Sequence, residues 1–322
     1  MPRRRSARHL RVAARSPTAD KRRRSALLRL SALSLAPMWS ILAFAQNASD
    51  LHALPRDALV IGNSKYRHLP PLRNPGNDAA ALGDLLQEIG FSVSPLLDAN
   101  KVSMEESIRD YCARLRKNRA IGLFYFAGHG LQLRWRNFLI PVDASLESSE
   151  DVGKGAVDLG SLLEGLRKAG NPMNVVVLDA CRDNPFRNDL VTGKGLSQVD
   201  APVGTFLAYA TSPGNAASDG DGKNGLYTEF LLKELRAPEA KIEDVFKRVR
   251  LSVRRASSGM QIPWESTSLE DDFYFIPPPR IVKASKEERE RQFKEELALW
   301  EKSEATVAAA LRSSRDRPAE GR

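Results

Sequence analysis

The sequence contains little cysteine: its 322 residues include only Cys112 and Cys181. Two cysteines are too few for the disulfide framework that stabilises small secreted domains. Cys112 lies in the pattern Ile108-x-x-Tyr111-Cys112-x-x-Leu115, a helical apolar face, where a buried and unreactive thiol is the expected arrangement. We therefore expect both thiols to be free.

The chain also lacks an excess of charge outside its N-terminal segment. Eleven of its 49 Lys and Arg residues, but only one of its 40 Asp and Glu residues, lie within residues 1–45. The formal charge of +9 thus comes from that segment, and the remainder is close to neutral. The basic composition is no argument for a nucleic-acid-binding surface, and no nucleic-acid partner is expected.

Residues 1–45 are typical of a targeting segment. A basic run precedes the apolar stretch Leu30–Ala45, which ends in the small-x-small sequence AFA that is found before signal-peptide cleavage sites. We expect cleavage near Gln46 and export to the periplasm or the medium. The stretch contains Pro37 and is shorter than the roughly 20 apolar residues that span a bilayer. The alternatives are an uncleaved membrane anchor and a misassigned start codon that leaves a disordered tail.

Short apolar runs alternate with helical segments from residue 58 onward. Most of the runs lack polar alternation, which is typical of strands buried on both faces of a parallel sheet. Their alternation with helices predicts an α/β fold of three layers. The expected strands are Ala58–Gly62, Phe91–Leu97, Ala120–Ala127, Asn174–Ala180 and Thr205–Ala210, and the expected helices are Asn77–Ile89, Met104–Lys117, Leu159–Ala169, Leu226–Leu235 and Ile242–Arg255.

Three consecutive prolines, Pro277–Pro279, mark the end of the predicted globular domain. They follow a last short apolar run, Asp272–Ile276, and they forbid a helix or a central strand at that point. The predicted domain therefore covers residues 55–278, which is long enough to bury a full-sized core.

Residues 283–322 are charged and rich in strong helix formers. Phe293, Leu297 and Trp300 are spaced by four and three residues, which predicts one amphipathic helix with a frayed tail. Its apolar stripe either packs on the domain or docks a partner.

Two residues suited to covalent catalysis follow successive expected strands. His129 lies in the sequence FAGHG at residues 126–130, and Cys181 in the sequence DACRD at residues 179–183. The carboxyl ends of parallel strands meet at one edge of a sheet, so we expect the two side chains to share a rim. An imidazole can take the proton of a thiol and later protonate a leaving amine, which suffices for acyl transfer. Backbone N–H groups of Gly130 and Cys181 would bind the resulting oxyanion.

These segments resemble those of bacterial caspase-like peptidases of the caspase and metacaspase clan. Supporting sequences are LRNPGNDA at residues 72–79 and AYATSPG at residues 208–214, and Cys181 follows His129 by 52 residues, close to the spacing of a caspase signature. The resemblance covers about two thirds of the chain. It implies a mostly parallel six-stranded sheet flanked by helices. It also implies a cysteine endopeptidase with Cys181 as nucleophile, His129 as general base and acid, and no third side chain.

The resemblance leaves two alternatives for specificity. In metacaspases, two acids receive an Arg or Lys side chain before the scissile bond, and their positions match Asp78 and Asp179. Charge-assisted hydrogen bonds suit such a pair to a guanidinium. Arg73 instead lies close to where caspases carry the arginine that selects Asp. We favour cleavage after basic residues, and the alternative role of Asp78 is to cap the helix that begins there.

The resemblance also places Tyr209 and Ser212 in the lining of the substrate groove. No metal or cofactor is expected. Some metacaspases need calcium, which makes calcium activation the alternative, but Asp219–Gly222 lacks the full ligand spacing of a known calcium loop.

Residues 184–204 are predicted to form an exposed linker between the larger and smaller parts of the domain, with Arg187 and Lys194 as self-cleavage sites. Asp143 resembles part of a family segment and is interpreted as structural. His52 has no partner in its sequence context and is expected on the surface.

Two other functions stay open on the sequence alone. The first is a non-catalytic caspase-like module that binds a peptide or a partner and docks through its C-terminal helix. The presence of both His129 and Cys181 favours the enzyme, which acts on peptide or protein substrates. The second is a redox-sensing thiol protein, for which Cys112 is a poor resolving partner because it lies within a helix.

Overall fold

A computed structural model describes residues 48–181, 196–197, 199–212 and 222–315, all within the unit Ala48–Arg322. The expected targeting segment, both self-cleavage sites, and Asp219 and Asp221 lie outside these ranges. Of Cys181 the backbone is described, and its side chain is not. Within the described ranges, no helix combines the length and apolar composition needed to cross a membrane.

Among the described residues, six strands run in the order β2-β1-β3-β6-β7-β8. The first five strands are parallel to one another and β8 is antiparallel to β7, which confirms the predicted mostly parallel sheet. A short antiparallel extension, β4 and β5, continues from the end of β3. The strands are β1 (Arg56–Gly62), β2 (Ser92–Leu97), β3 (Ile121–Leu133), β4 (Arg136–Leu139), β5 (Val157–Asp158), β6 (Asn174–Cys181), β7 (Thr205–Tyr209) and β8 (Trp264–Thr267).

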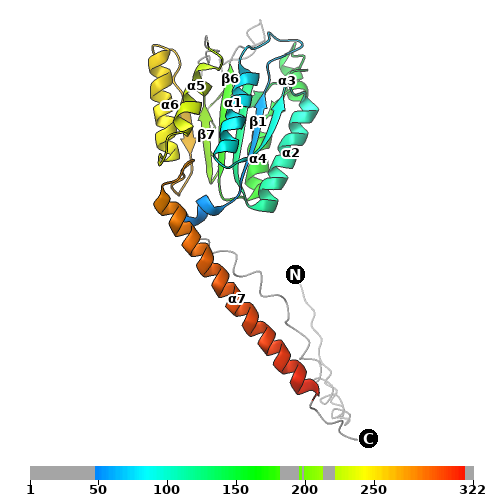
Figure 1. Cartoon of the computed structure of the whole chain (residues 1–322). Coiled ribbons are helices and arrows are strands. Elements are labelled where there is room, and N and C mark those ends of the chain that lie inside the picture. The colour runs from blue at the N-terminus through cyan, green and yellow to red at the C-terminus, as the bar shows by residue number, and fades with distance from the viewer. Residues whose placement is uncertain (1–47, 182–195, 198, 213–221, 316–322) are drawn as a thin grey trace, which may run out of the picture. The chain divides into compact units, whose positions relative to one another are not determined.

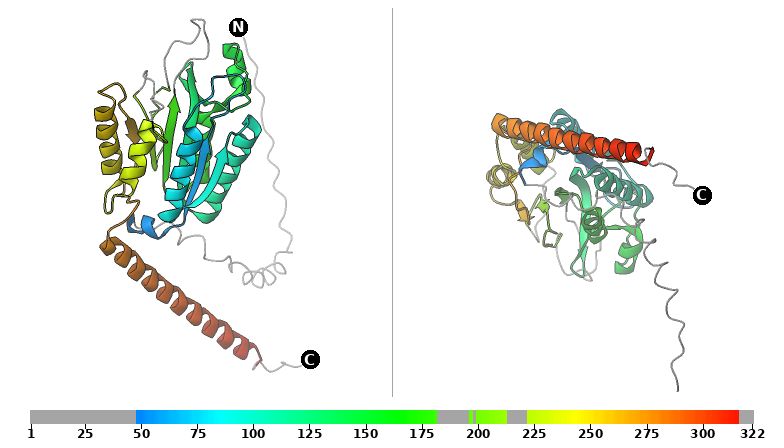
Figure 2. Two further views of the ribbon diagram at one scale, coloured as in Figure 1. Left: turned by 45° about the horizontal axis from the view of Figure 1, so that its top comes forward. Right: turned by 90° about the horizontal axis from the view of Figure 1, so that it is seen from below.

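Helices cover both faces of this sheet (Figures 1 and 2), as the predicted three-layer fold requires. Val60 and Leu123 pack under α1, α5 and α6, whereas their neighbours Leu59 and Phe124 pack under α2 and α4. Successive strand residues point to opposite faces, so each strand feeds both cores. The helices are η3 (Ala48–Ala53), α1 (Pro75–Glu88), α2 (Lys101–Asn118), α3 (Ser149–Gly155), α4 (Leu159–Ala169), α5 (Leu226–Leu235), α6 (Ile242–Ala256) and α7 (Pro279–Arg315).

Several elements differ from the prediction at the edges of the sheet. Strand β3 continues past Ala127 to Leu133, because its last residues form a hairpin with β4. The last strand is β8, whose sequence WEST has no apolar run to reveal it. The run Asp272–Ile276 instead makes an isolated bridge between Lys241 and Tyr274.

Helix α7 begins earlier than expected. Pro279 is its first residue, a position that tolerates proline because the missing N–H would have no partner there. The helix contacts η3 (Figure 1). Its expected apolar stripe is exposed and does not pack on the domain: Phe293, Leu297 and Trp300.

Two residues within the predicted linker, Leu196 and Ser197, are buried, contrary to the expectation of exposure, whereas Asp200 and Val203 nearer its end are exposed. Leu196 is 2% exposed and Ser197 is 6% exposed. The backbone N–H of Ser197 donates to Oδ1 of Asn137 at 2.7 Å, and Nδ2 of Asn137 donates to the Ser197 carbonyl at 2.8 Å. These bonds attach the segment to β4.

The prediction that His52 is a surface residue is wrong. Its ring stacks on that of Phe273, with centroids 5.5 Å apart. Burial, together with the nearby charge of Arg56, lowers the pKa of His52 from 6.5 to about 4. A single histidine in a short helix carries no periodic signal that would reveal this packing.

This pKa predicts a dependence of stability on pH. Between pH 6.5 and about 4 the unfolded chain binds a proton at His52 and the folded protein does not, so this stabilisation is complete above pH 6.5 and is lost as the pH falls. His52→Phe keeps an aromatic ring and removes the titrating group. Its free energy of unfolding should fall less than that of the wild type between about pH 7 and about pH 5 in urea titrations. An equal fall in the free energy of unfolding in both proteins would contradict the lowered pKa of His52.

Candidate active site

The two residues expected to react lie opposite each other in the sheet. Strands β3 and β6 are parallel neighbours, and their register pairs the Cα of His129 with the Cα of Cys181. Paired strands are about 4.8 Å apart. The backbone therefore places both residues at one point of the rim formed by the carboxyl ends of the strands.

The loop after β1 holds the His129 side chain. Nε2 lies 2.8 Å from the carbonyl oxygen of Pro70. A carbonyl only accepts, so we assign the ring proton to Nε2 and the lone pair to Nδ1. The backbone N–H of His129 donates to Oη of Tyr66 at 2.7 Å, and the two rings pack with centroids 4.4 Å apart. The family resemblance implied no third side chain, and the group found on Nε2 is a main-chain carbonyl.

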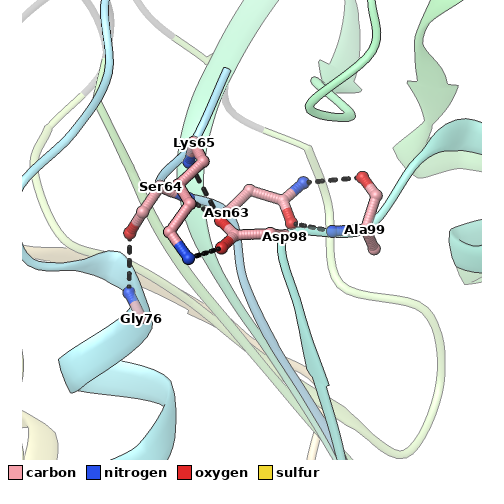
Figure 3. Close-up of polar contacts among 6 residues, drawn as sticks. All are labelled: Asn63, Ser64, Lys65, Gly76, Asp98 and Ala99. Carbon is pink, nitrogen blue, oxygen red and sulfur yellow. Dashed lines mark hydrogen bonds and ion pairs between the residues drawn. The ribbon is translucent and has the colours of Figure 1, made fainter. Parts of the chain in front are cut away.

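This loop, residues 63–74, is fixed at its base by polar contacts (Figure 3). Oδ1 of Asp98 accepts from the backbone N–H groups of Ser64 and Lys65 at 2.8 and 2.9 Å. Oγ of Ser64 accepts from the N–H of Gly76 at 3.0 Å, which joins the loop to the first turn of α1. The loop is thus tied to both β2 and α1.

Asn63 connects the same loop to the strand that follows the histidine. Its Oδ1 accepts from the N–H of Ala99 at 2.9 Å, and its Nδ2 donates to the carbonyl of Ile140 at 3.1 Å. Oη of Tyr66 donates to that same carbonyl at 3.2 Å. The N–H of Ile140 donates in turn to the carbonyl of His129 at 3.0 Å. The imidazole is therefore positioned by bonds that reach several neighbouring segments.

Gly128 is required by the close approach of Tyr66. A Cβ on Gly128 would lie 2.6 Å from Oη of Tyr66 and 2.9 Å from Cζ of Phe126. A Cβ on Gly130 would lie 3.0 Å from Cβ of Ala180. Both glycines are therefore closely packed against their neighbours.

The two acids expected to bind a basic side chain come together from α1 and β6. Oδ1 of Asp78 accepts from Nδ2 of Asn224 and from the N–H of Gly225, both at 2.9 Å. Oδ2 of Asp179 accepts from Oγ1 of Thr228 at 2.7 Å. A Cβ on Gly225 would lie 3.0 Å from Oδ2 of Asp78 and 3.8 Å from Oδ2 of Asp179, so both carboxylates approach one point.

The alternative in which Asp78 caps α1 is wrong. The helix begins at Pro75 and its N-cap is Asn74, so Asp78 lies within the first turn. Its carboxylate accepts from residues beside α5, as described above, and it is 3% exposed.

The other residues singled out from the sequence lie around this rim or away from it. Ser212 is half-buried just after β7 and Arg73 is exposed in the loop before α1. Tyr209 is 2% exposed and belongs to the core under α2 and α4. Oδ1 of Asp143 accepts from the N–H of Lys101 at 3.1 Å, which confirms its structural role at the start of α2.

Cys112 is a free, half-buried thiol on α2. A Cβ on Gly165 would lie 3.0 Å from its Sγ, so the thiol fills the contact between α2 and α4. Burial raises the pKa of Cys112, which keeps the thiol protonated and unreactive. Across the described part of the chain, no cluster of three or more His, Cys, Asp and Glu side chains could hold a metal ion.

Sequence reasoning did not single out four of the groups that surround the site. Pro70 acts through its carbonyl, which every residue type possesses. Tyr66 and Asn224 lie in irregular segments without periodicity, and Thr228 lies in the first turns of a predicted helix, where a threonine is ordinary. No sequence signal distinguished them.

A mostly parallel sheet covered on both faces, with a histidine and a cysteine paired at the ends of adjacent strands, defines an α/β protein of caspase-like architecture. The family model of the caspase domain matches residues 55–274. The chain belongs to the caspase-domain family.

Curated relatives agree with this assignment. The chain is 30% identical over 181 residues to the human mucosa-associated lymphoid tissue lymphoma translocation protein 1. The aligned residues make up 55% of this chain and 21% of that protein. The chain is 23% identical over 240 residues to mouse caspase-1, and this alignment covers 69% of this chain and 60% of caspase-1. The matches thus span about a fifth of the first relative's length and less than two thirds of the second.

The contacts of Tyr66 predict its contribution to stability. Tyr66→Phe keeps the ring on His129 and removes the hydroxyl, which leaves the buried N–H of His129 without its acceptor. An unsatisfied buried donor costs about 1–3 kcal/mol, so the free energy of unfolding should fall by that amount in chemical denaturation. A variant as stable as the wild type would show that this hydroxyl does not hold the histidine strand.

Proposed function

We propose that this protein is a cysteine endopeptidase that cleaves after Arg or Lys, with Cys181 as nucleophile and His129 as general base and acid. The observation that carries the proposal is the register of β3 and β6, which pairs these two residues at the carboxyl ends of the strands in a caspase domain.

The hydrogen bonds of His129 support its role in proton transfer. With Nε2–H on the Pro70 carbonyl, Nδ1 is the basic nitrogen that takes the proton of the Cys181 thiol. The thiolate attacks the carbonyl carbon of the scissile bond. The imidazolium then gives its proton to the leaving amine, and water hydrolyses the thioester. The Pro70 carbonyl stabilises the imidazolium while it exists, because it accepts a charge-assisted hydrogen bond.

The backbone N–H groups of Gly130 and Cys181 are proposed to bind the oxyanion. In the β3–β4 ladder, Gly130 faces Leu139 and is adjacent to the hydrogen-bonded pair of His129 and Ile140. Antiparallel ladders alternate bonded and non-bonded pairs, so the N–H of Gly130 points away from β4. It therefore points toward β6, where Cys181 is paired with His129, and it is proposed to donate to the oxyanion there.

Asp78 and Asp179 are proposed to receive the basic side chain before the scissile bond. Their carboxylates approach one point beside Gly225, and two negative charges there would repel an acidic side chain. Arg73, the residue that would select Asp, lies exposed before α1. Ser212, half-buried after β7, is proposed to border the same groove.

Four further features stay proposals on the sequence alone. Residues 1–45 are proposed to export the domain, and Arg187 and Lys194 to be self-cleavage sites. The reaction is proposed to need no calcium. Peptide or protein substrates, rather than nucleic acid, are the proposed partners.

Removal of the histidine tests the proposed dyad. His129→Ala should leave the fold intact and slow acylation by roughly 10²- to 10⁴-fold, the usual contribution of general acid–base catalysis. Labelling by a thiol-directed peptide probe, followed over time by mass spectrometry, measures the rate. Cys181→Ala is the control that should not be labelled at this site. An equally reactive His129→Ala protein would contradict the dyad.

A peptide library varied at the residue before the scissile bond tests the specificity. Residues 46–322 should cleave after Arg and Lys, and the Cys181→Ala protein should not. Asp78→Asn should lose most of this cleavage, whereas Asp84→Asn, an exposed aspartate on the same helix, should match the wild type. Cleavage after Asp would contradict the proposal and assign the selection to Arg73.

A further inference from the structure

The start of helix α5 supplies hydrogen-bond donors to both carboxylates of the proposed pocket. Asn224 and Gly225 donate to Oδ1 of Asp78, both at 2.9 Å, and Thr228 donates to Oδ2 of Asp179 at 2.7 Å. Hydrogen bonds to a charged group are shorter and stronger than those between neutral groups. One segment, residues 224–228, therefore fixes an acid on α1 relative to an acid on β6.

The hydroxyl of Thr228 is the middle of a directed chain. Its single proton is on Oδ2 of Asp179, so the contact of 2.6 Å between Thr228 Oγ1 and Tyr125 Oη has the tyrosine as donor. The tyrosine thereby orients the Thr228 hydroxyl toward the carboxylate, and Oη of Tyr125 itself lies 3.5 Å from Oδ2 of Asp179. Burial and the charge of Asp179 raise the pKa of Tyr125 well above its ordinary value, which keeps the tyrosine a donor. Thr228 and Tyr125 are both fully buried.

Gly225 lies against both acids, so that a side chain at this position would contact their carboxylates. A Cβ there would lie 3.0 Å from Oδ2 of Asp78, closer than ordinary van der Waals contact. The backbone does not demand glycine, because φ is −60° and ψ is 147°, values that any L-residue adopts. The glycine is thus explained by the space beside the carboxylates and not by the conformation of the chain.

We infer that residues 224–228 are the specificity-determining segment of this pocket, with Thr228 as the positioning residue of Asp179 and Gly225 keeping the space between the two acids open. The inference rests on the proposed function and names its preferred substrate. A guanidinium is planar and presents five donors in a fixed fork, which suits it to bridge two separately held carboxylates. The ammonium group of Lys is a compact point charge, which is less suited to bridge the two carboxylates. Arg is therefore preferred to Lys.

Replacement of the threonine tests the positioning role. We compare Thr228→Val, which removes the hydroxyl, with Thr228→Ser, which restores it, on peptides with Arg, Lys or the neutral isostere citrulline before the scissile bond. Loss of a hydrogen bond to a charged group predicts a rise in KM for the Arg peptide of roughly 10- to 100-fold in Thr228→Val. In Thr228→Val, kcat/KM for the Arg peptide divided by kcat/KM for the citrulline peptide should also fall. Thr228→Ser should restore both the KM and this ratio. The matched control is Thr205→Val. Thr205 is a buried threonine at the first residue of β7, at the amino end of the strand, and the variant should behave as the wild type.

Replacement of the glycine tests the space between the acids. Gly225→Ala should fold, because its backbone is compatible with alanine, and should raise KM for the Arg peptide while narrowing the preference for Arg over Lys. A wild-type KM and a wild-type Arg-to-citrulline ratio in both Thr228→Val and Gly225→Ala would overturn the inference.

A binding measurement separates this inference from the proposed function. Calorimetry on the Cys181→Ala protein, with benzamidine as a planar amidinium probe, reports on the pocket without catalysis. Binding that weakens in Thr228→Val supports the inference even where the wild type cleaves nothing, an outcome that would overturn the proposed function alone. Binding that is undetectable, or equal in both proteins, would overturn the inference even where the wild type cleaves peptides.

Discussion

The site depends on the register between β3 and β6. Because the two strands are parallel neighbours, their carboxyl ends meet at one edge of the sheet, and the register pairs His129 with Cys181. A shift of one residue would move these positions to opposite faces of their strands relative to each other. The two buried cores on either side of the sheet resist that shift, since each strand contributes alternate apolar side chains to both. Core packing thus supplies the precision that acyl transfer requires.

Around this pair, polar groups are held mainly by main-chain partners. The carbonyl of Pro70 fixes the imidazole, and the backbone N–H of Gly225 helps to fix Asp78. The loop after β1 can do this because it is tied to β2 through Asp98 and to α1 through Ser64. Donors from one segment, residues 224–228, hold both carboxylates in place.

The sequence predicted the parts of the fold that depend on apolar patterning, and it found the residues whose chemistry is distinctive. Short apolar runs identified the five parallel strands, although β2 includes two serines, and β8 was not predicted because its sequence is polar. His129 and Cys181 were found because their positions after successive strands follow from the strand pattern. Pro70 could not be found, since it acts through a carbonyl that all residues share. Thr228 could not be found either, because only the packing of α5 against the sheet brings its hydroxyl to a carboxylate.

The most direct test of the central claim is covalent capture of the nucleophile by substrate-like electrophiles. The full chain is treated with acyloxymethyl ketone peptides that end in Arg or in Asp, and the modified residue is located by mass spectrometry of proteolytic fragments. The structure predicts a Cys181 adduct with the Arg reagent, no adduct with the Asp reagent, and no reaction at Cys112. An adduct with the Asp reagent and none with the Arg reagent would contradict the pocket formed by Asp78 and Asp179.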